Sequence, residues 1–509
     1  MTETAAQRNQ RNAARSQSGR SRRADLRRAQ GLPGTLGITA LSAVLPGSGF
    51  IFAGRRTLGL LVLLPTLLVA VLGGWYAATH VRSLLRTAVD PDRLTILSVA
   101  LITLLVAWVA VVVATYRMVR PLQRPRWHNY VGAAFVVVLC LLVSAPLAVG
   151  ARYSMVQADL VNSVFQQHTH SATRPTVTAA DPWGDQERVN VLLLGGDGGV
   201  NRMGIRTDTV IVASMDVDTG ETVLFSLPRN LMNVPFPEDS PLHKLYPHGF
   251  SGDGPDAEYM LNAIYRNVPA MHPGVLGRTD NPGADALKLG VSAALGIDVD
   301  YYLLVNLAGF EQIVDAMGGV TVNINEPIPI GGNTDLGIEP KDYLEPGPDQ
   351  HLNGFEALWF ARGRYGSDDY ERMERQRCMI DAIVDKAEPV NLLRRYQELA
   401  KAGKEILRTD IPQDLLPAFV DLLLKVKDQE LESVVFRSSE QFTPGDPDYD
   451  WVHATVQEAI DPPEPTHAQP ASHDSTTPEQ ATLQPAAGAG TSPDQAVEAA
   501  DSCAYDPVE

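Results

Sequence analysis

Four short clusters in the sequence contain the residue types that bind metal ions and phosphate groups. Two are built on aspartate and two on arginine: Gly195-Gly196-Asp197, Arg206-Thr207-Asp208-Thr209, Ser226-Leu227-Pro228-Arg229-Asn230, and the stretch from Ala361-Arg362-Gly363-Arg364 to Arg377. Each cluster alone also fits an ordinary role: a tight turn, a strand-end cap, a surface arginine or the solvated face of a helix. The chemistry they offer together is the binding of an anion with a metal ion.

The last cluster has a helical pattern that places an arginine beside apolar residues. Arg372 and Gln376 are four positions apart, so they share one face of a helix. Met379, Ile380 and Ile383 lie near that face. Because a charge on a stripe of buried apolar side chains needs a partner, an anion is expected there.

Pyrophosphate is an anion that suits these residues. Four arginines could bind it bidentately, through the fork geometry of the guanidinium group: Arg229, Arg362, Arg364 and Arg372. Asp197 and Asp208 would hold a Mg²⁺ ion that neutralises the same phosphates, because Mg²⁺ prefers hard oxygen ligands. No CxxC motif or Cys/His cluster indicates a zinc site.

Alternating strand and helix patterns place these clusters in an α/β domain. Short apolar runs predict strands at 188–194, 209–217, 221–226, 301–305, 319–324 and 434–437. Helical patterns occupy 256–267, 283–295, 307–317, 353–361 and most of 368–427. This order predicts a mixed central sheet that helices cover on both faces.

Charge is unevenly distributed along the 509 residues. Residues 1–150 contain 17 Arg, no Lys and four acidic residues, whereas the remainder contains 25 Lys and Arg against 56 Asp and Glu. The basic part suits the cytoplasmic face of a membrane. The acidic part speaks against a nucleic-acid partner for the main domain.

Three apolar runs are long enough to span a membrane as helices: 57–77, 95–116 and 129–149. A fourth run, 34–53, is interrupted at Pro46-Gly47. Arginines at positions 117, 120, 124 and 126 place the loop between the last two spans in the cytoplasm. A cytoplasmic N-terminus then requires 34–53 to be re-entrant, and residues after 150 lie outside the cell.

The chain is therefore expected to have five parts. They are a disordered basic tail at 1–33, the transmembrane region at 34–150, a linker at 151–187, the external α/β domain at 188–458, and a disordered tail at 459–509.

Two of the three cysteines, Cys378 and Cys503, lie in the part expected outside the cell. Disulfides persist in oxidising compartments, and the long tail can reach back to the helix without strain. We therefore expect these two cysteines to form a disulfide. The alternative is a buried cysteine in the helix and an unrelated free thiol in the tail.

A set of ordered motifs resembles the LytR–CpsA–Psr family over about residues 188–390: LLLGGD, RTDT, SLPRN, YYLLVN, FEQIVDAMGGV, LNGFEALWFARGR and DYERMERQR. The multi-span N-terminus with PGSGFIFAGRR resembles members from high-GC Gram-positive bacteria. The resemblance implies a phosphotransferase that attaches a glycopolymer, such as teichoic acid, capsule or arabinogalactan, to peptidoglycan. The implied donor is a polyprenyl-pyrophosphate lipid, with its tail in an apolar tunnel.

Motif by motif, the resemblance assigns the family's metal-binding carboxylates to Asp197 and Asp208. It assigns the phosphate-binding residues to Arg229, Arg362, Arg364, Arg372 and Gln376. Two positions depart from the family pattern. RTDT replaces RSDT and keeps the hydroxyl group, whereas Asn230 replaces the aspartate of PRD and lacks its carboxylate.

These observations predict Mg²⁺-dependent phosphoryl transfer outside the cell by a multi-pass membrane protein. Arg229, Arg362, Arg364 and Asp208 are the expected catalytic residues, and Asp208, Asp368 and Asp369 are equal candidates for the general base. A hydrolase that uses water at the same site, and a non-catalytic module that binds lipid pyrophosphates, are the alternatives. No helix-turn-helix pattern supports transcriptional control.

Overall fold

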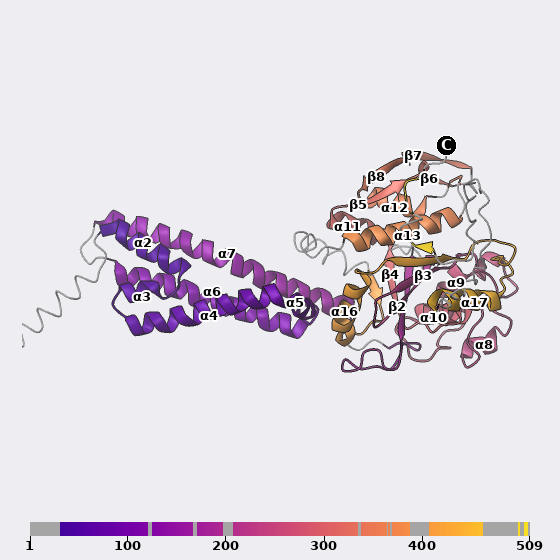
Figure 1. Cartoon of the computed structure of the whole chain (residues 1–509), viewed down its shortest axis with the longest axis horizontal. Coiled ribbons are helices and arrows are strands. Elements are labelled where there is room, and N and C mark those ends of the chain that lie inside the picture. The colour runs from indigo at the N-terminus through magenta and orange to yellow at the C-terminus, as the bar shows by residue number, and fades with distance from the viewer. Residues whose placement is uncertain are drawn as a thin grey trace, which may run out of the picture. The chain divides into compact units, whose positions relative to one another are not determined.

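The computed structural model describes residues 31–120, 125–165, 170–196, 207–333, 337–363, 365–366, 369–386, 407–461, 497–498 and 503–506. The chain forms two compact units, Met1–Asp159 and Leu160–Glu509. Figure 1 shows the helices and strands of both.

The described residues of the N-terminal unit are helical. They form α2 (Gly31–Val44), α3 (Ser48–Phe52), α4 (Arg56–Thr79), α5 (Val81–Ala88), α6 (Pro91–Val119) and the first part of α7 (Arg126–Val164). By length and composition, α4, α6 and α7 can cross a membrane. Large apolar side chains on them are exposed, such as Leu61 at 73% and Leu142 at 66%. Such apolar surface is typical of a membrane anchor.

The three long helices contain the three spans predicted from the sequence. The fourth apolar run, 34–53, divides into α2 and α3 at Gly47, whose φ of 94° is a conformation that glycine adopts without strain. Neither α2 nor α3 has the length of a transmembrane helix.

The linker predicted at 151–187 is a helix in its first part. α7 continues to Val164, and Ala151, Ser154, Ala158 and Val161 are buried. Their three- and four-residue spacing is that of one helix face, which explains why the helix does not end with the apolar span. Between the first two predicted spans, residues 81–88 also form a helix, α5.

The C-terminal unit is built on a seven-stranded mixed sheet with the order β11-β10-β3-β2-β1-β4-β9. The strands are β1 (Arg188–Gly196), β2 (Thr207–Asp216), β3 (Thr222–Ser226), β4 (Tyr301–Asn306), β9 (Leu407–Thr409), β10 (Leu431–Val435) and β11 (Val497–Glu498). β2 is antiparallel to β1 and β3, β4 is parallel to β1, and β10 is parallel to β3. β1, β3, β4 and β10 therefore end at one edge of the sheet, where β2 begins.

Alternate side chains of the strands point to opposite faces of this sheet. Leu192 and Leu194 of β1 pack into the larger core, where they meet α9 (Leu261–Met271), α10 (Pro282–Leu295) and α17 (Tyr449–Ile460). Leu193 points to the other face, under α11 (Leu307–Met317), α12 (Gly354–Arg362) and α13 (Asp369–Lys386). Figure 1 shows these helix layers on the two sides of the sheet. The predicted α/β fold is confirmed.

Two small sheets accompany the central one. β5 (Val320–Ile324) pairs with β8 (Gly347–Leu352), and β6 (Ile328–Asn333) pairs with β7 (Ile338–Leu344). The predicted strand at 319–324 is thus present but lies outside the central sheet. The other three strands were not predicted, because glycines, prolines and charges interrupt the apolar alternation in them.

Two sequence-based expectations for the C-terminal third are wrong in part. The helical stretch predicted at 368–427 contains α13 and α16 (Leu416–Val426), but also the edge strand β9; residues 387–406 lie outside the described residues. The tail predicted as disordered from 459 contains β11, which pairs with β10. It also contains residues 503–506, which the structure describes.

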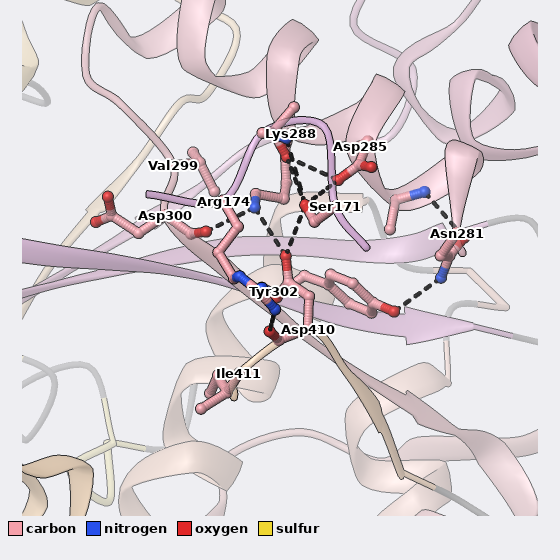
Figure 2. A network of polar contacts seen from close by, with 12 residues as sticks. Ser171, Arg174, Asn281, Asp285, Lys288, Val299, Asp300, Tyr302, Asp410 and Ile411 are labelled. Atoms are coloured by element: carbon pink, nitrogen blue, oxygen red, sulfur yellow. Dashed lines mark hydrogen bonds and ion pairs between the residues drawn. The ribbon is translucent and has the colours of Figure 1, made fainter. Parts of the chain in front are cut away.

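The segment that follows α7 is fixed to the domain by a polar network (Figure 2). The Asp285 carboxylate accepts hydrogen bonds from Ser171 Oγ at 2.7 Å and from the backbone N–H of Ala172 at 2.9 Å. Lys288 is fully buried and donates to Asp410 Oδ2 at 2.9 Å. The pairing matters because a buried charge without a partner is strongly destabilising. Residues 170–174 thus belong to the folded domain and not to a free linker.

Candidate active site

The edge where β1, β3, β4 and β10 end carries the predicted site residues. Asp208 is the second residue of β2, which begins at this edge. Arg229 follows the end of β3 by three residues. Because each of five strands has one of its ends at this edge, residues far apart in the sequence meet at one place.

Asp208 and Arg229 form an ion pair. Arg229 Nη1 lies 2.9 Å from Asp208 Oδ1, and the two side chains are 27% and 42% exposed. Arg372 of α13 is only 4% exposed and donates from Nη2 to the Asp208 carbonyl oxygen at 3.2 Å. The structure therefore brings these three predicted residues together: the ion pair of Asp208 and Arg229 is partly exposed, and Arg372 is buried beside it.

α13 also holds the end of α12, where Arg362 lies. Gln376 Nε2 donates to the Ala361 carbonyl oxygen at 3.1 Å, and Arg375 Nε donates to the Phe360 carbonyl oxygen at 2.9 Å. These bonds satisfy carbonyl groups that the last turn of a helix leaves without a partner. The guanidinium of Arg362 stays exposed.

Two contacts of the ARGR motif explain its position. The guanidinium of Arg362 lies 4.8 Å from the ring centroid of Trp359, in a cation–π contact. A Cβ atom on Gly363 would lie 2.7 Å from the Pro329 carbonyl oxygen, so only glycine lets the motif lie this close to β6. Trp359 and Arg375 were not singled out from the sequence, because their roles depend on contacts between α12, α13 and β6.

An apolar pocket of about 330 Å³ opens beside these residues. Its walls come from β1, β2, β4, α11, α12 and α13, and they include Leu193, Ile211, Phe310, Met379 and Ile380. Arg362 is the charged side chain in this lining, and Asn306 and Gln376 are its amide side chains. The sequence predicted an apolar tunnel only through the family resemblance, and the residues that line it could not be traced.

Three predicted residues, Asp197, Arg364 and Asp368, lie outside the described residues. Asp369 is the first residue of α13, but its side chain is also outside them. Within the described part of the chain, no group of three or more His, Cys, Asp or Glu side chains could hold a metal ion. The Asp208 carboxylate is compatible with Mg²⁺ even as a single protein ligand. This ion commonly takes one or two protein carboxylates and completes its shell with phosphate oxygens and water.

Cys378 of α13 and Cys503 form a disulfide with a Cα–Cα distance of 5.4 Å, the pairing expected from the sequence. Asn323 Nδ2 donates to the Cys503 carbonyl oxygen at 2.8 Å, and Asn325 Nδ2 to the Ala504 carbonyl oxygen at 3.1 Å. The end of the tail is thus attached to β5 and to the helix that carries Arg372 and Gln376.

Comparison with known proteins places the chain in a family. The model of the LytR_cpsA_psr family matches residues 154–459, which is more than half of the chain, and the chain belongs to this family. This range contains the strands of the central sheet except β11, and the helix layers on its two faces, which Figure 1 shows.

Relatives of the chain are named teichoic acid transferases. The Enterococcus faecalis polyisoprenyl-teichoic acid–peptidoglycan teichoic acid transferase TagU is 29% identical over 235 residues, which are 45% of this chain and 64% of that protein. The protein of the same name from Oceanobacillus iheyensis is 26% identical, over 58% of this chain and 80% of that protein. The crystal structure of B. subtilis TagV is 22% identical with a TM-score of 0.38, and the match covers 54% of this chain and 97% of that one. The match thus spans just under two thirds of the E. faecalis relative.

The disulfide generates a first prediction. Cys503→Ala should lower the free energy of unfolding of the C-terminal unit by up to about 4 kcal/mol, because the bond closes a long loop in the unfolded chain. Denaturant unfolding of the full-length protein measures the difference. Cys140→Ala, at the free cysteine, is the matched control and should change stability little. Non-reducing peptide mapping that recovers Cys378 and Cys503 only as free thiols would contradict the pairing.

Proposed function

We propose that the protein is a phosphotransferase that moves a glycopolymer from a polyprenyl-pyrophosphate lipid to peptidoglycan. The observation that carries this proposal is that an apolar pocket lies beside the edge of the sheet where the arginines of the site gather. The apolar lining of the pocket suits part of an isoprenoid chain, since each CH₂ group moved from water to an apolar wall contributes about 0.8 kcal/mol. Arg362 and Gln376 line the same pocket, where the pyrophosphate of such a lipid would emerge.

The arginines at this edge have the chemistry to stabilise the reaction. The hydroxyl oxygen of an acceptor sugar attacks the phosphorus bonded to the glycopolymer, and the bond from that phosphorus to the bridging oxygen breaks. Polyprenyl phosphate leaves, and the hydroxyl proton passes to a carboxylate, for which Asp208, Asp368 and Asp369 remain candidates. Arg229, Arg362, Arg364 and Arg372 would stabilise the charge on the phosphates, which is the main catalytic task in phosphoryl transfer.

Mg²⁺ belongs to the proposal as well. Asp197 and Asp208 would hold the ion, and it would supply charge neutralisation on the pyrophosphate. The support is the donor chemistry of Asp208 and its place beside Arg229 and Arg372.

The names of the relatives support transfer to peptidoglycan over the two alternatives. Hydrolysis of the same lipid would use the same residues with water as the acceptor. A non-catalytic module would bind the lipid without turnover. A product assay separates both alternatives from transfer, because only transfer attaches the glycopolymer to peptidoglycan. The donor that the protein accepts decides the kind of glycopolymer, teichoic acid or arabinogalactan.

The proposal places the C-terminal unit outside the cell, with the N-terminus in the cytoplasm. Arg117, Arg120 and Arg126 flank the short connection between α6 and α7, and such positive loops stay inside. The disulfide between Cys378 and Cys503 favours an oxidising compartment for the domain. The membrane itself and its lipids are the remaining partners, and no nucleic acid is involved.

The central test is transfer by purified full-length protein from lipid donor to peptidoglycan. Arg362→Ala or Arg364→Ala should reduce the transfer rate by roughly 10²–10³, the cost of removing one charge-stabilising contact from a transition state. Arg278→Ala is the control, because Arg278 is an exposed arginine on another loop, and it should transfer normally. Near wild-type transfer by both site variants would reject the anion site, and equal phosphate-lipid release without acceptor would support the hydrolase.

The metal proposal is tested by titration of Mg²⁺ into chelator-treated protein. Asp197→Asn and Asp208→Asn should each raise the Mg²⁺ concentration required for half-maximal transfer, because each removes an anionic oxygen ligand. Asp349→Asn, at an exposed position of β8, should leave the requirement unchanged. Full activity of the wild-type protein in excess chelator would rule out the ion.

The topology is tested by labelling of intact cells with a membrane-impermeant maleimide. A cysteine at the exposed position Ala179, introduced into a Cys140→Ala background, should react in intact cells. Ala179→Cys is preferable to a site at Ser171, whose hydroxyl is hydrogen-bonded to Asp285. Ser18→Cys should react only after lysis; the reverse pattern would overturn the orientation.

A further inference from the structure

A second cavity, different in character from the apolar pocket, lies where β10 ends. Its volume is about 430 Å³, and it is lined mainly by residues 437–441 and by Trp451 of α17. Volumes of roughly 300–1,000 Å³ are typical of small-molecule sites. We call it the polar pocket, because Arg437, Ser438, Glu440 and Gln441 line it.

The loop after β10, which lines the polar pocket, is joined to the segment that carries Arg229. The backbone N–H of Phe436 donates to the Ser226 carbonyl oxygen at 3.3 Å, and that of Met232 donates to the Pro444 carbonyl oxygen at 2.8 Å. The loop after β10 therefore lies directly against residues 226–232. The Tyr449 hydroxyl, at the start of α17, donates to the Met232 carbonyl oxygen at 2.9 Å and completes this contact.

The same loop after β10 also joins the polar pocket to α13. The hydroxyl groups of Tyr370 and Ser438 are 2.8 Å apart, and Arg437 forms an ion pair with Glu374. Tyr370 and Glu374 lie on either side of Arg372 in the helix, and Arg372 donates to the Asp208 carbonyl oxygen. The polar pocket thus borders the same two segments that build the anion site.

The strand order separates the two pockets along the sheet. The polar pocket lies at β10, Arg229 follows β3, Asp208 is on β2, and the apolar pocket lies over β1, β2 and β4. Phosphoryl transfer places the attacking and leaving oxygens roughly in line on opposite sides of phosphorus. A leaving polyprenyl phosphate on the side of β1 and β4 therefore calls for an acceptor on the side of β10.

The lining of the polar pocket suits a sugar ring. Its hydroxyl, amide, carboxylate and guanidinium groups can donate and accept hydrogen bonds with sugar hydroxyls. Trp451 adds an indole, which combines a large apolar surface for C–H groups with one polar N–H. It packs edge-on against Phe436, with 6.2 Å between the ring centroids, so the indole is held in place.

We propose that the polar pocket is a subsite for a sugar residue of the acceptor glycan. The inference rests on the proposed function, because it assigns the second substrate of the same reaction. A sugar of the donor glycopolymer has the same chemistry, and the two sources differ in which substrate loses affinity when the pocket is altered.

The test uses full-length protein, the lipid donor and a soluble peptidoglycan fragment as acceptor. Glu440→Ala combined with Gln441→Ala removes two exposed side chains of the polar pocket. This double variant should raise the KM for the acceptor at least tenfold and leave the KM for the donor within twofold of wild type. Trp451→Phe, which keeps an aromatic ring against Phe436, should also raise the acceptor KM. Thr443→Ala, exposed in the same loop but outside the pocket, is the matched control.

Two other kinetic outcomes would overturn the assignment. A raised donor KM with an unchanged acceptor KM would give the polar pocket to the donor glycopolymer. An acceptor KM within twofold of wild type in both altered proteins would leave the pocket without a role in acceptor binding.

Saturation-transfer NMR with the same fragment separates this inference from the proposed function. If wild-type protein transfers nothing but binds the fragment, and the double variant loses that binding at least fivefold, only the proposed function fails. Absence of binding by wild type rejects the subsite itself.

Discussion

The two-residue alternation of the central strands is the constraint on which the rest of the domain depends. It sends Leu192 and Leu194 into the larger core and Leu193 to the opposite face. One face is closed by α9, α10 and α17, so the sheet is stable on that side. The other face is covered by α11, α12 and α13 without being filled, and the apolar pocket remains. A one-residue shift in β1 would exchange the two faces and remove both the core and the pocket.

The electrostatics of the site follow from the acidity of the domain around it. The chain after residue 150 carries 25 basic residues against 56 acidic ones, so the anionic headgroup of the proposed lipid donor would gain little attraction from the net charge of the domain. The local concentration of arginine at one sheet edge must therefore provide the attraction. Arg229 is paired with Asp208 at this partly open edge. Because the arginine is paired and partly exposed, its desolvation cost is smaller than that of a lone buried charge.

The parts of the structure that were predictable from the sequence are those whose pattern is local. The runs that became β1 to β4, α10, α11 and α12 have clear periodicity and end signals. β6 and β7 contain glycines and prolines that read as loop, and β9 has only three residues. The clusters around Asp208, Arg229 and Arg372 were found because their residue types carry the chemistry. The pocket walls were not, because Leu193, Phe310 and Met379 look like any core residues until the sheet and helices are assembled.

α13 connects the separate parts of the site into one unit. Over about two and a half turns, its Tyr370 contacts Ser438 of the polar pocket, its Arg372 contacts the Asp208 backbone, and its Met379 lines the apolar pocket. A rotation of this helix about its axis would disturb all three contacts together, so its placement must be fixed from outside the site. The disulfide at Cys378 and the hydrogen bond from Arg375 to α12 provide that restraint through residues outside the apolar pocket. The attached end of the tail is thereby part of what positions the site, although Cys503 lies 125 residues from Cys378 in the sequence.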